Sequence, residues 1–544
     1  MKDYMTSPKS HVGFCDMILS HLPLVGSWIL AVFFCLDFLS ALPSYLPIDD
    51  SYIIMAYARN VVEHGDFFSY NHGTPSTGIT SPLYCLSIAL CKLLFAGETG
   101  YASAVRLVGF VSFLVSLVSG SIWVWFISGK GCRGHFSAVL FSVFWGCWGY
   151  IHFFAFCGME PILYIALVMM ALCLFVKGRD FLAGCILGAS ALCRPEAVFM
   201  GFLFGLEVAC GFVRGLLKKD PSLAKRKLMA GLCLAFGFFI VYGVWLFRCL
   251  VVSGTIFPST VTMKTHGAVD WNQVWNYARC FLTMRTHGSW EYNLVGMSET
   301  AWMTLRSWCP VALASVLAII VVRKNPRYWL PMLYPVVHFV FTFSKNCSCG
   351  DNMRYHVLDF TIVLASVAVF FAGIIVTTRK KWGGVRIVAS ISGVFLSVIL
   401  CWLVISDAKY QLRLFTNMAA HFNILDYSIG RWLKSNTPPD TVVALYQAGG
   451  IKFFGQREII DGGGVTDHTM FPYLKGPKNL LWAIVERKAD YIASFGDEWL
   501  SGYGLHMRDR RFFTPVNIRC RGLYKVNKEA LKAYADSRYQ EGQL

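Results

Sequence analysis

Apolar stretches long enough to cross a lipid bilayer recur through the first 405 of the 544 residues. A membrane-spanning helix needs about 20 mostly apolar residues, and many such segments cannot all be buried in one water-soluble core. Hydrophobic residues make up 56% of the chain and charged residues only 15%, whereas soluble proteins carry about 25% charged residues. These features exclude a disordered chain and an ordinary soluble enzyme, and they predict an α-helical polytopic membrane protein.

The chain is predicted to cross the bilayer eleven times. The expected spans are residues 24–46, 103–127, 134–150, 160–176, 180–193, 195–213, 228–252, 306–322, 328–343, 357–377 and 385–405. Segment 82–96 is also apolar but is short for a span, so we expect it to be an interfacial or re-entrant helix.

The basic residues set the predicted orientation. If 82–96 does not cross, the basic clusters fall on one side: Lys2/Lys9, Lys130/Arg133, Lys177/Arg179, the run 214–227, Arg323/Lys324/Arg327 and Arg379/Lys380/Lys381. Because cytoplasmic loops carry the excess of Lys and Arg, the N-terminus is expected in the cytoplasm and the C-terminus outside. The formal net charge of +17 is therefore a topology signal, and no nucleic-acid partner is expected.

The composition changes after about residue 410. This change predicts a membrane domain at 1–409, with an outer loop at 47–81, and an extracytoplasmic soluble α/β domain at 410–544. In the second domain we expect helices at 416–435 and 477–488 and strands at 441–446, 458–461 and 491–494. Its glycines form neither of the common phosphate-binding motifs, so nucleotide binding is not supported.

Two adjacent carboxylates, Asp49 and Asp50, begin the outer loop directly before a predicted helix at 51–63. One of them could simply cap this helix, which would stabilise it by about 1 kcal/mol. A cap does not account for the second aspartate. Adjacent carboxylates repel each other, so one can hold its proton more tightly. This arrangement suits a general base beside a low-dielectric wall.

Further ionisable residues fall at the same predicted outer face. They are Glu160, Arg194, Glu196, Lys264, Asp351, Arg354 and His356. Each alone is explained by a solvated loop charge or by a long side chain that reaches the interface. Together they predict an outward-facing cavity that holds acids for deprotonation and cations for a phosphate.

The residues of the outer loop resemble the first outer loop of the GT-C membrane glycosyltransferases. The matching stretches are Asp49-Asp-Ser-Tyr-Ile53, Tyr57-Ala-Arg59-Asn60, Gly65, Tyr70-Asn71, Gly78 and Thr80-Ser-Pro-Leu83. Later blocks resemble the same family in the same order: Gly158-Met-Glu160, Arg194-Pro-Glu196, Pro258-Ser-Thr260 with Lys264, and Gly350-Asp351 with Arg354-Tyr355. The particular branch looks like the bacterial one that includes the mycobacterial terminal arabinofuranosyltransferase.

The resemblance implies an enzyme of the bacterial plasma membrane that moves a sugar from a polyprenyl-phosphate donor to an extracytoplasmic glycan or glycolipid. Asp49 or Asp50 would take the proton from the acceptor hydroxyl, with inversion at the anomeric carbon. Glu160 belongs to the same expected catalytic group. Substrate binding is expected from Arg59, Arg194, Glu196, Lys264, Asp351, Arg354 and His356, and the apolar groove beside 82–96 would admit the polyprenyl tail.

No cofactor is certain from the sequence. Some relatives use a divalent cation, Mg or Mn, between a carboxylate and the phosphate, but no dense carboxylate cage is visible in this chain. Two other classes remain open. A secondary transporter predicts repeated halves and polar residues near the middle of broken helices, and a non-catalytic glycan-binding or assembly protein predicts that Asp49 and Asp50 are replaceable.

Overall fold

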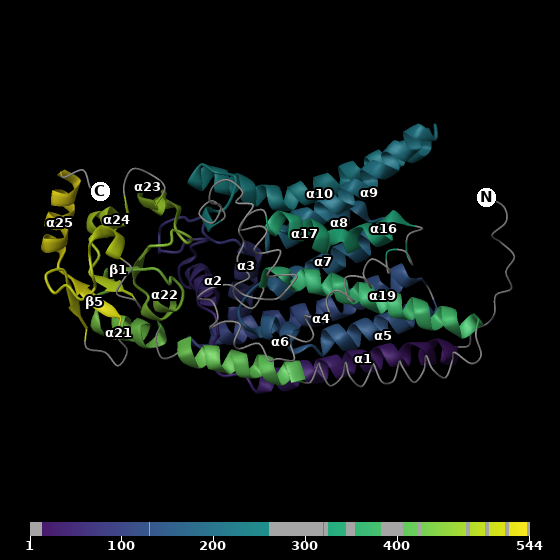
Figure 1. The fold of residues 1–544 in the computed structure, drawn as a ribbon, viewed down its shortest axis with the longest axis horizontal. Helices are drawn as coiled ribbons and strands as arrows, with labels where there is room; N and C mark the ends of the chain where they lie inside the picture. Colours follow the sequence, from purple (N-terminus) through teal and green to yellow (C-terminus); the bar gives the residue numbers. More distant parts are fainter. Residues whose placement is uncertain are drawn as a thin grey trace.

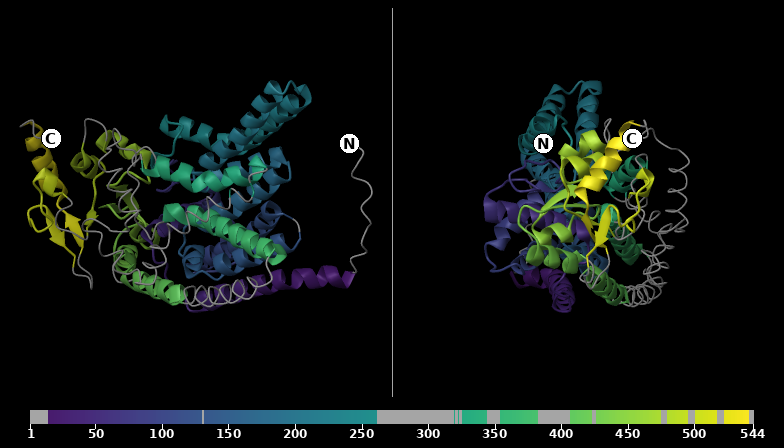
Figure 2. Two further views of the ribbon diagram at one scale, coloured as in Figure 1. Left: turned by 45° about the vertical axis from the view of Figure 1, so that its right-hand side comes forward. Right: turned by 90° about the vertical axis from the view of Figure 1, so that its left-hand side faces the viewer.

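The computed structural model describes residues 14–129, 131–260, 319, 322, 325–343, 354–381, 406–422, 426–474, 479–494, 500–516 and 522–540. A bundle of long helices fills most of the length of the molecule, and a small β-sheet with short helices lies at one end (Figure 1). The first described turn of α1 lies at the opposite end of the molecule (Figure 2). We call the end of the bundle beside the sheet the sheet end.

The bundle is built from apolar helices whose bounds follow the hydrophobic stretches of the sequence. They are α1 (Phe14–Ser40), α4 (Gly100–Ser128), α5 (Cys132–Gly146), α6 (Gly149–Phe156), α7 (Pro161–Val176), α8 (Asp180–Ala191), α9 (Ala197–Leu217), α10 (Pro221–Ser253), α16 (Pro326–Trp329), α17 (Tyr334–Phe343) and α19 (Val357–Lys381).

Among the described residues, five helices are long and apolar enough to span a membrane, and the pair α5 and α6, bent by 60°, makes a sixth. α7 and α8 are apolar but shorter. The predicted spans 306–322 and 385–405 lie outside the described residues except for positions 319 and 322, and the other predicted spans overlap the helices above.

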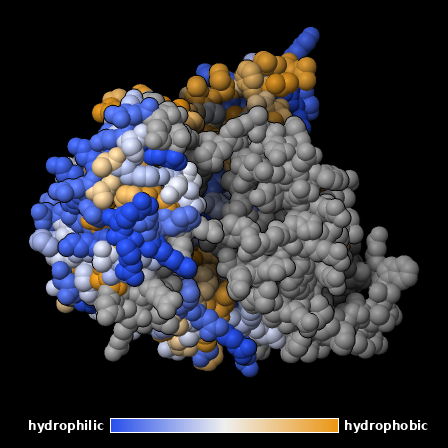
Figure 3. All heavy atoms as spheres, turned by 60° about the vertical axis from the view of Figure 1, so that its left-hand side comes forward, coloured by the Kyte–Doolittle hydropathy of each residue, from blue (hydrophilic) through white to orange (hydrophobic). Residues whose placement is uncertain are grey.

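Large apolar side chains are exposed along the outside of the bundle. On α10, Phe236, Phe239 and Val244 are each at least 60% exposed. Hydrophobic side chains gather on the helices at the top of Figure 3, whereas hydrophilic side chains cover the sheet region at the left. A contiguous apolar face on a helix bundle is typical of a surface that contacts lipid, so the bundle is suited to a membrane.

Two short helices cover the sheet end of the bundle. Helix α2 (Asp49–Arg59) continues into the π-helix η1 (Asn60–His64), and α3 (Pro82–Lys92) follows the loop between them. The capping role considered for one aspartate is wrong. The N-cap position is Ile48, and both Asp49 and Asp50 lie within the first turn of α2, where their negative charge favours the helix dipole.

The sheet has five short strands in the order β2-β1-β3-β5-β4. They are β1 (Val442–Leu445), β2 (Glu458–Asp461), β3 (Tyr491–Ala493), β4 (Phe513–Pro515) and β5 (Leu523–Val526). β1 pairs in parallel with β2 and β3, and β5 pairs antiparallel with β3 and β4. The accompanying helices are α21 (Ser428–Asn436), α22 (Gly450–Gly455), α23 (Phe471–Leu474), α24 (Leu480–Glu486) and α25 (Lys528–Gln540).

The strands expected at 441–446, 458–461 and 491–494 and the helix expected at 477–488 are confirmed by β1, β2, β3 and α24. The helix expected at 416–435 is described as two segments, 406–422 and α21. The sequence patterns did not predict β4 and β5, because strands of three and four residues show little alternation of apolar and polar side chains.

The region after residue 410 packs against the loop 47–81, and we call this contact the seam. The ring of Tyr52 in α2 stacks on Phe422 at a centroid distance of 4.5 Å, and it also contacts Phe453 and Phe454 of α22. Asn71 donates to the backbone oxygen of Ile459 in β2 at 2.9 Å. The hydrophobic core runs continuously across this seam, which fixes α2 between the bundle and the sheet.

Candidate functional site

A cavity of about 220 Å³ lies at the sheet end of the bundle. Segments far apart in the chain form its wall: Asp50, Ile53 and Ile54 of α2, residues 78–81 before α3, Met159–Glu160, 193–196 between α8 and α9, Thr260, Arg354–Tyr355, and Val465–Thr466 beyond β2. Five of these residues, Asp50, Glu160, Arg194, Glu196 and Arg354, are charged and were expected at one site.

Arg194 joins two carboxylates on one side of the cavity. Its guanidinium lies 2.6 Å from Glu160 Oε1 and 2.9 Å from Glu196 Oε1. Burial alone would lower the pKa of Arg194, but the Glu196 and Glu160 carboxylates raise it above its usual value. Burial likewise opposes ionisation of Glu196, yet Arg194 holds its pKa below the usual range. Arg194 and Glu196 are therefore both charged, and Glu196 Oε2 is buried without a hydrogen-bond partner among the described residues.

Arg354 and Asp50 form a second ion pair in the cavity wall. Arg354 Nη1 lies 2.7 Å from Asp50 Oδ2, and the Asp50 side chain is 41% exposed. The ring of Tyr355 lies 4.7 Å from the Arg194 guanidinium and 5.1 Å from that of Arg354. Stacking on one aromatic ring orients both guanidinium groups, because the ring face attracts cations.

Asp49 points to the other side of α2, into the seam. Its carboxylate accepts hydrogen bonds from the backbone N–H groups of Gly449 at 3.0 Å and Gly450 at 2.8 Å. Burial raises the pKa of Asp49 to about 7 against these hydrogen bonds, and the Asp50 carboxylate contributes to the rise. A side chain at Gly449 would overlap the backbone of Asp49, so this approach requires glycine.

Backbone from the region after β2 also lines the cavity and contacts α2. Tyr57 donates to the backbone oxygen of Thr466 at 2.7 Å, and Thr260 donates to that of Val465 at 2.8 Å. Gly78 packs directly against Thr466, where a Cβ atom would clash. Thr466 and Val465 were not expected at the site, because neither carries a chemical signature in the sequence.

The remaining predicted site residues lie elsewhere. Arg59 is buried in the seam, 3.9 Å over the ring of Phe453 and paired with Glu98 at 3.3 Å, and it does not line the cavity. His356 lies one residue beyond the cavity wall, and its Nδ1 is 2.7 Å from Asp359 Oδ2. Lys264 and Asp351 lie outside the described residues.

Comparisons with known proteins agree with this architecture. A family model described as "Domain of unknown function (DUF8728)" matches residues 411–539, and no curated protein matches the sequence. Among solved structures, ArnT from Cupriavidus metallidurans bound to undecaprenyl phosphate is similar with a TM-score of 0.55 and 12% identity, covering 93% of this chain and 97% of that one.

The Archaeoglobus fulgidus oligosaccharyltransferase in the apo form is similar with a TM-score of 0.54 and 10% identity, over 90% of this chain and 73% of that one. The same archaeal enzyme, AglB, in complex with an inhibitory peptide and a dolichol-phosphate gives a TM-score of 0.51 and 11% identity, over 88% and 70%. These are GT-C structures. The chain therefore shares the fold of these structures, while the number of spans, the separate C-terminal domain and the arabinofuranosyltransferase-like branch stay predictions.

Proposed function

We propose that this protein is a GT-C-type membrane glycosyltransferase that moves a sugar from a polyprenyl-phosphate donor to a hydroxyl group of a cell-envelope glycan or glycolipid. The observation that carries the proposal is the cavity at the sheet end. Five charged residues from four separate stretches of chain meet there, and moving charged groups out of water is costly even when they are paired.

Asp50 is the proposed general base. It lines the cavity and keeps part of its carboxylate exposed, whereas Asp49 is held in the seam by two backbone N–H groups. Asp50 takes the proton of the acceptor hydroxyl as that oxygen bonds to the anomeric carbon. The bond from this carbon to the phosphate oxygen breaks, its electron pair leaves with the lipid phosphate, and attack from the opposite face inverts the configuration.

Arg354 and Arg194 are the proposed ligands of the departing phosphate, whose charge grows in the transition state. The carboxylates that pair with these two guanidinium groups outnumber them. Asp50, Glu160 and Glu196 against Arg194 and Arg354 leave one formal negative charge among the described cavity residues. Phosphate binding therefore calls for further positive charge, which Lys264 or a divalent cation would supply. Glu196 Oε2, which has no hydrogen-bond partner in the described part of the chain, is suited to accept a hydrogen bond from a sugar hydroxyl.

The lipid tail of the donor is proposed to leave the cavity beside α3. Ser81, at the start of this helix, lines the cavity, and Leu90, Leu93 and Leu94 at its far end are each about 70% exposed. An apolar surface next to a polar cavity suits a lipid-linked phosphate. The undecaprenyl phosphate named with ArnT and the dolichol-phosphate named with AglB support the same class of ligand.

The cavity is proposed to lie on the extracytoplasmic side of a bacterial plasma membrane, and the basic clusters support this orientation under the positive-inside rule. The acceptor would then be a glycan or glycolipid of the envelope, and an arabinofuranosyl-type sugar is the finer form of the proposal.

Deletion of the gene and complementation test this function. Mass spectrometry of envelope glycans should show one sugar lost in the deletion strain and restored by the wild-type gene but not by Asp50→Asn. The matched control is Asp66→Asn, since Asp66 lies in the same loop and binds His72 and Gly73 outside the cavity. Restoration by Asp50→Asn as complete as that by wild type would instead favour the non-catalytic assembly protein.

A further inference from the structure

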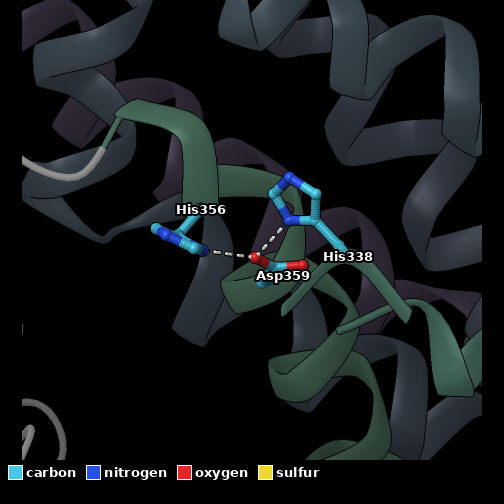
Figure 4. A group of neighbouring side chains, drawn as sticks. All are labelled: His338, His356 and Asp359. Carbon is cyan, nitrogen blue, oxygen red and sulfur yellow. Dashed lines mark hydrogen bonds and ion pairs between the residues drawn. The ribbon is translucent and has the colours of Figure 1, made fainter. Parts of the chain in front are cut away.

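A second cluster of ionisable side chains lies inside the bundle, behind the wall of the cavity. His338 of α17, His356 of the 3-10 turn η3 (Arg354–His356) and Asp359 of α19 converge there. Nδ1 of His338 and Nδ1 of His356 lie 2.8 and 2.7 Å from the same atom, Asp359 Oδ2 (Figure 4). The three side chains are at most 10% exposed.

Hydrogen bonds alone leave this cluster incompletely satisfied. Two neutral imidazoles can each donate one N–H to Asp359 Oδ2, but Oδ1 of the same carboxylate is buried without a partner among the described residues. A carboxylate within a membrane-spanning helix is costly and marks a functional position by default. The rings of Phe199 and Tyr334 pack against His338 at 5.8 and 5.4 Å, so aromatic rings cover this side of the cluster.

We propose that His338, His356 and Asp359 bind a zinc ion. Two imidazole nitrogens and one carboxylate form a zinc ligand set, whereas Mg²⁺ and Ca²⁺ prefer oxygen ligands. The three ligand atoms already lie within 4.8 Å of one another. Zinc bonds of about 2.0–2.2 Å in tetrahedral geometry place neighbouring ligand atoms about 3.4 Å apart, so the nitrogen-to-oxygen distances would widen by roughly half an ångström.

This zinc would position the cavity wall. It would tie α17 to the start of α19 and so fix the turn that carries Arg354 and Tyr355 into the cavity. It is separate from a Mg or Mn ion between a cavity carboxylate and the phosphate. Zinc binding by these three residues does not depend on whether the cavity transfers sugar.

Metal analysis of the purified full-length protein tests the site. The protein should carry no polyhistidine tag, be stripped with a chelator, be reloaded with zinc and be freed of unbound metal before mass spectrometry. Wild type should keep about one zinc per chain, and His338→Asn and Asp359→Asn should lose at least nine-tenths of it. The matched control is His152→Asn, because His152 is also fully buried but bonds the backbone oxygen of Gly146.

Cobalt loading gives a second readout, since a four-coordinate site shows visible d–d bands without thiolate charge-transfer bands. Wild-type protein that keeps less than a tenth of an equivalent of zinc would show a hydrogen-bonded triad only and would overturn the proposal. Equal zinc in wild type and His338→Asn, or thiolate bands in the cobalt form, would assign the metal to cysteines and overturn it as well. If the variants fail to insert, the wild-type zinc content and cobalt spectrum decide.

Discussion

The two sides of helix α2 differ in how their charges are held. On the cavity side, Asp50 pairs with one guanidinium and remains partly exposed. On the seam side, Asp49 and Arg59 are bound by backbone groups of the region after residue 410. Successive residues of an α-helix point about 100° apart, so adjacent aspartates face different surroundings. The Asp50 carboxylate therefore faces the cavity, whereas Asp49 holds two parts of the chain together.

The strongest test of the different roles of Asp49 and Asp50 is to exchange each aspartate for asparagine. Asp50→Asn should lower the rate of polyprenyl-phosphate release from a lipid-linked sugar by about 10²–10⁴-fold, because the variant lacks the proposed general base. Asp49→Asn should lower the rate by less than tenfold, since asparagine keeps one acceptor for the seam. Initial rates in proteoliposomes measure both. The assignment is reversed if Asp49→Asn is inactive while Asp50→Asn works.

A second test acts on the seam alone. Gly449→Ala should lower the thermal unfolding midpoint, because a Cβ atom at this position overlaps the backbone of Asp49, and forcing extra atoms into a packed region costs about 1–3 kcal/mol. Gly205→Ala is the matched control, since a Cβ atom there meets nothing within 4 Å. Equal unfolding midpoints for the two variants would show that the seam accommodates the added methyl group without loss of stability.

A further test uses the pH dependence of the seam. Burial raises the pKa of Asp49 to about 7 and that of Asp426, its electrostatic neighbour, to about 8. A carboxyl group whose pKa is raised on folding stabilises the protein most below about pH 4, and this contribution is lost as the pH rises to between 7 and 8. The slope is at most about 1.4 kcal/mol per pH unit for one group.

Thermal unfolding of wild type and Asp49→Asn between pH 4 and pH 8 measures this dependence. As the pH rises from 4 to 8, the unfolding midpoint of the variant should fall less than that of wild type. Parallel profiles for the two proteins would mean that Asp49 does not hold a proton in the seam.

Much of the fold could be predicted from the sequence. The helices of the bundle follow long apolar stretches, and β1 and β2 follow runs of apolar and β-branched residues bounded by turn residues. These are strong local signals. β4 and β5 carry weak ones, because three or four residues define almost no period. The bend between α5 and α6 also lies within a stretch that reads as one span.

The candidate site divides in the same way. The order of spans was enough to expect Glu160, Arg194 and Arg354 at one end of the bundle. The different roles of Asp49 and Asp50 could not be predicted, because the partners of Asp49 are backbone N–H groups 400 residues later in the chain. A backbone N–H or carbonyl group is present in almost every residue, so the residue type does not reveal such a contact. For the same reason, Thr466 in the cavity wall could not be predicted.

The distance in sequence between Asp49 and Gly449 also sets an order of events during synthesis. A ribosome adds about 5–20 residues per second, so Asp49 is made roughly 20–80 s before the glycines that bind it. During that interval α2 lacks its contacts with the region after residue 410, and the cavity lacks the part of its wall that Val465 and Thr466 form. A nascent chain interrupted before the final quarter would therefore lack this part of the cavity wall.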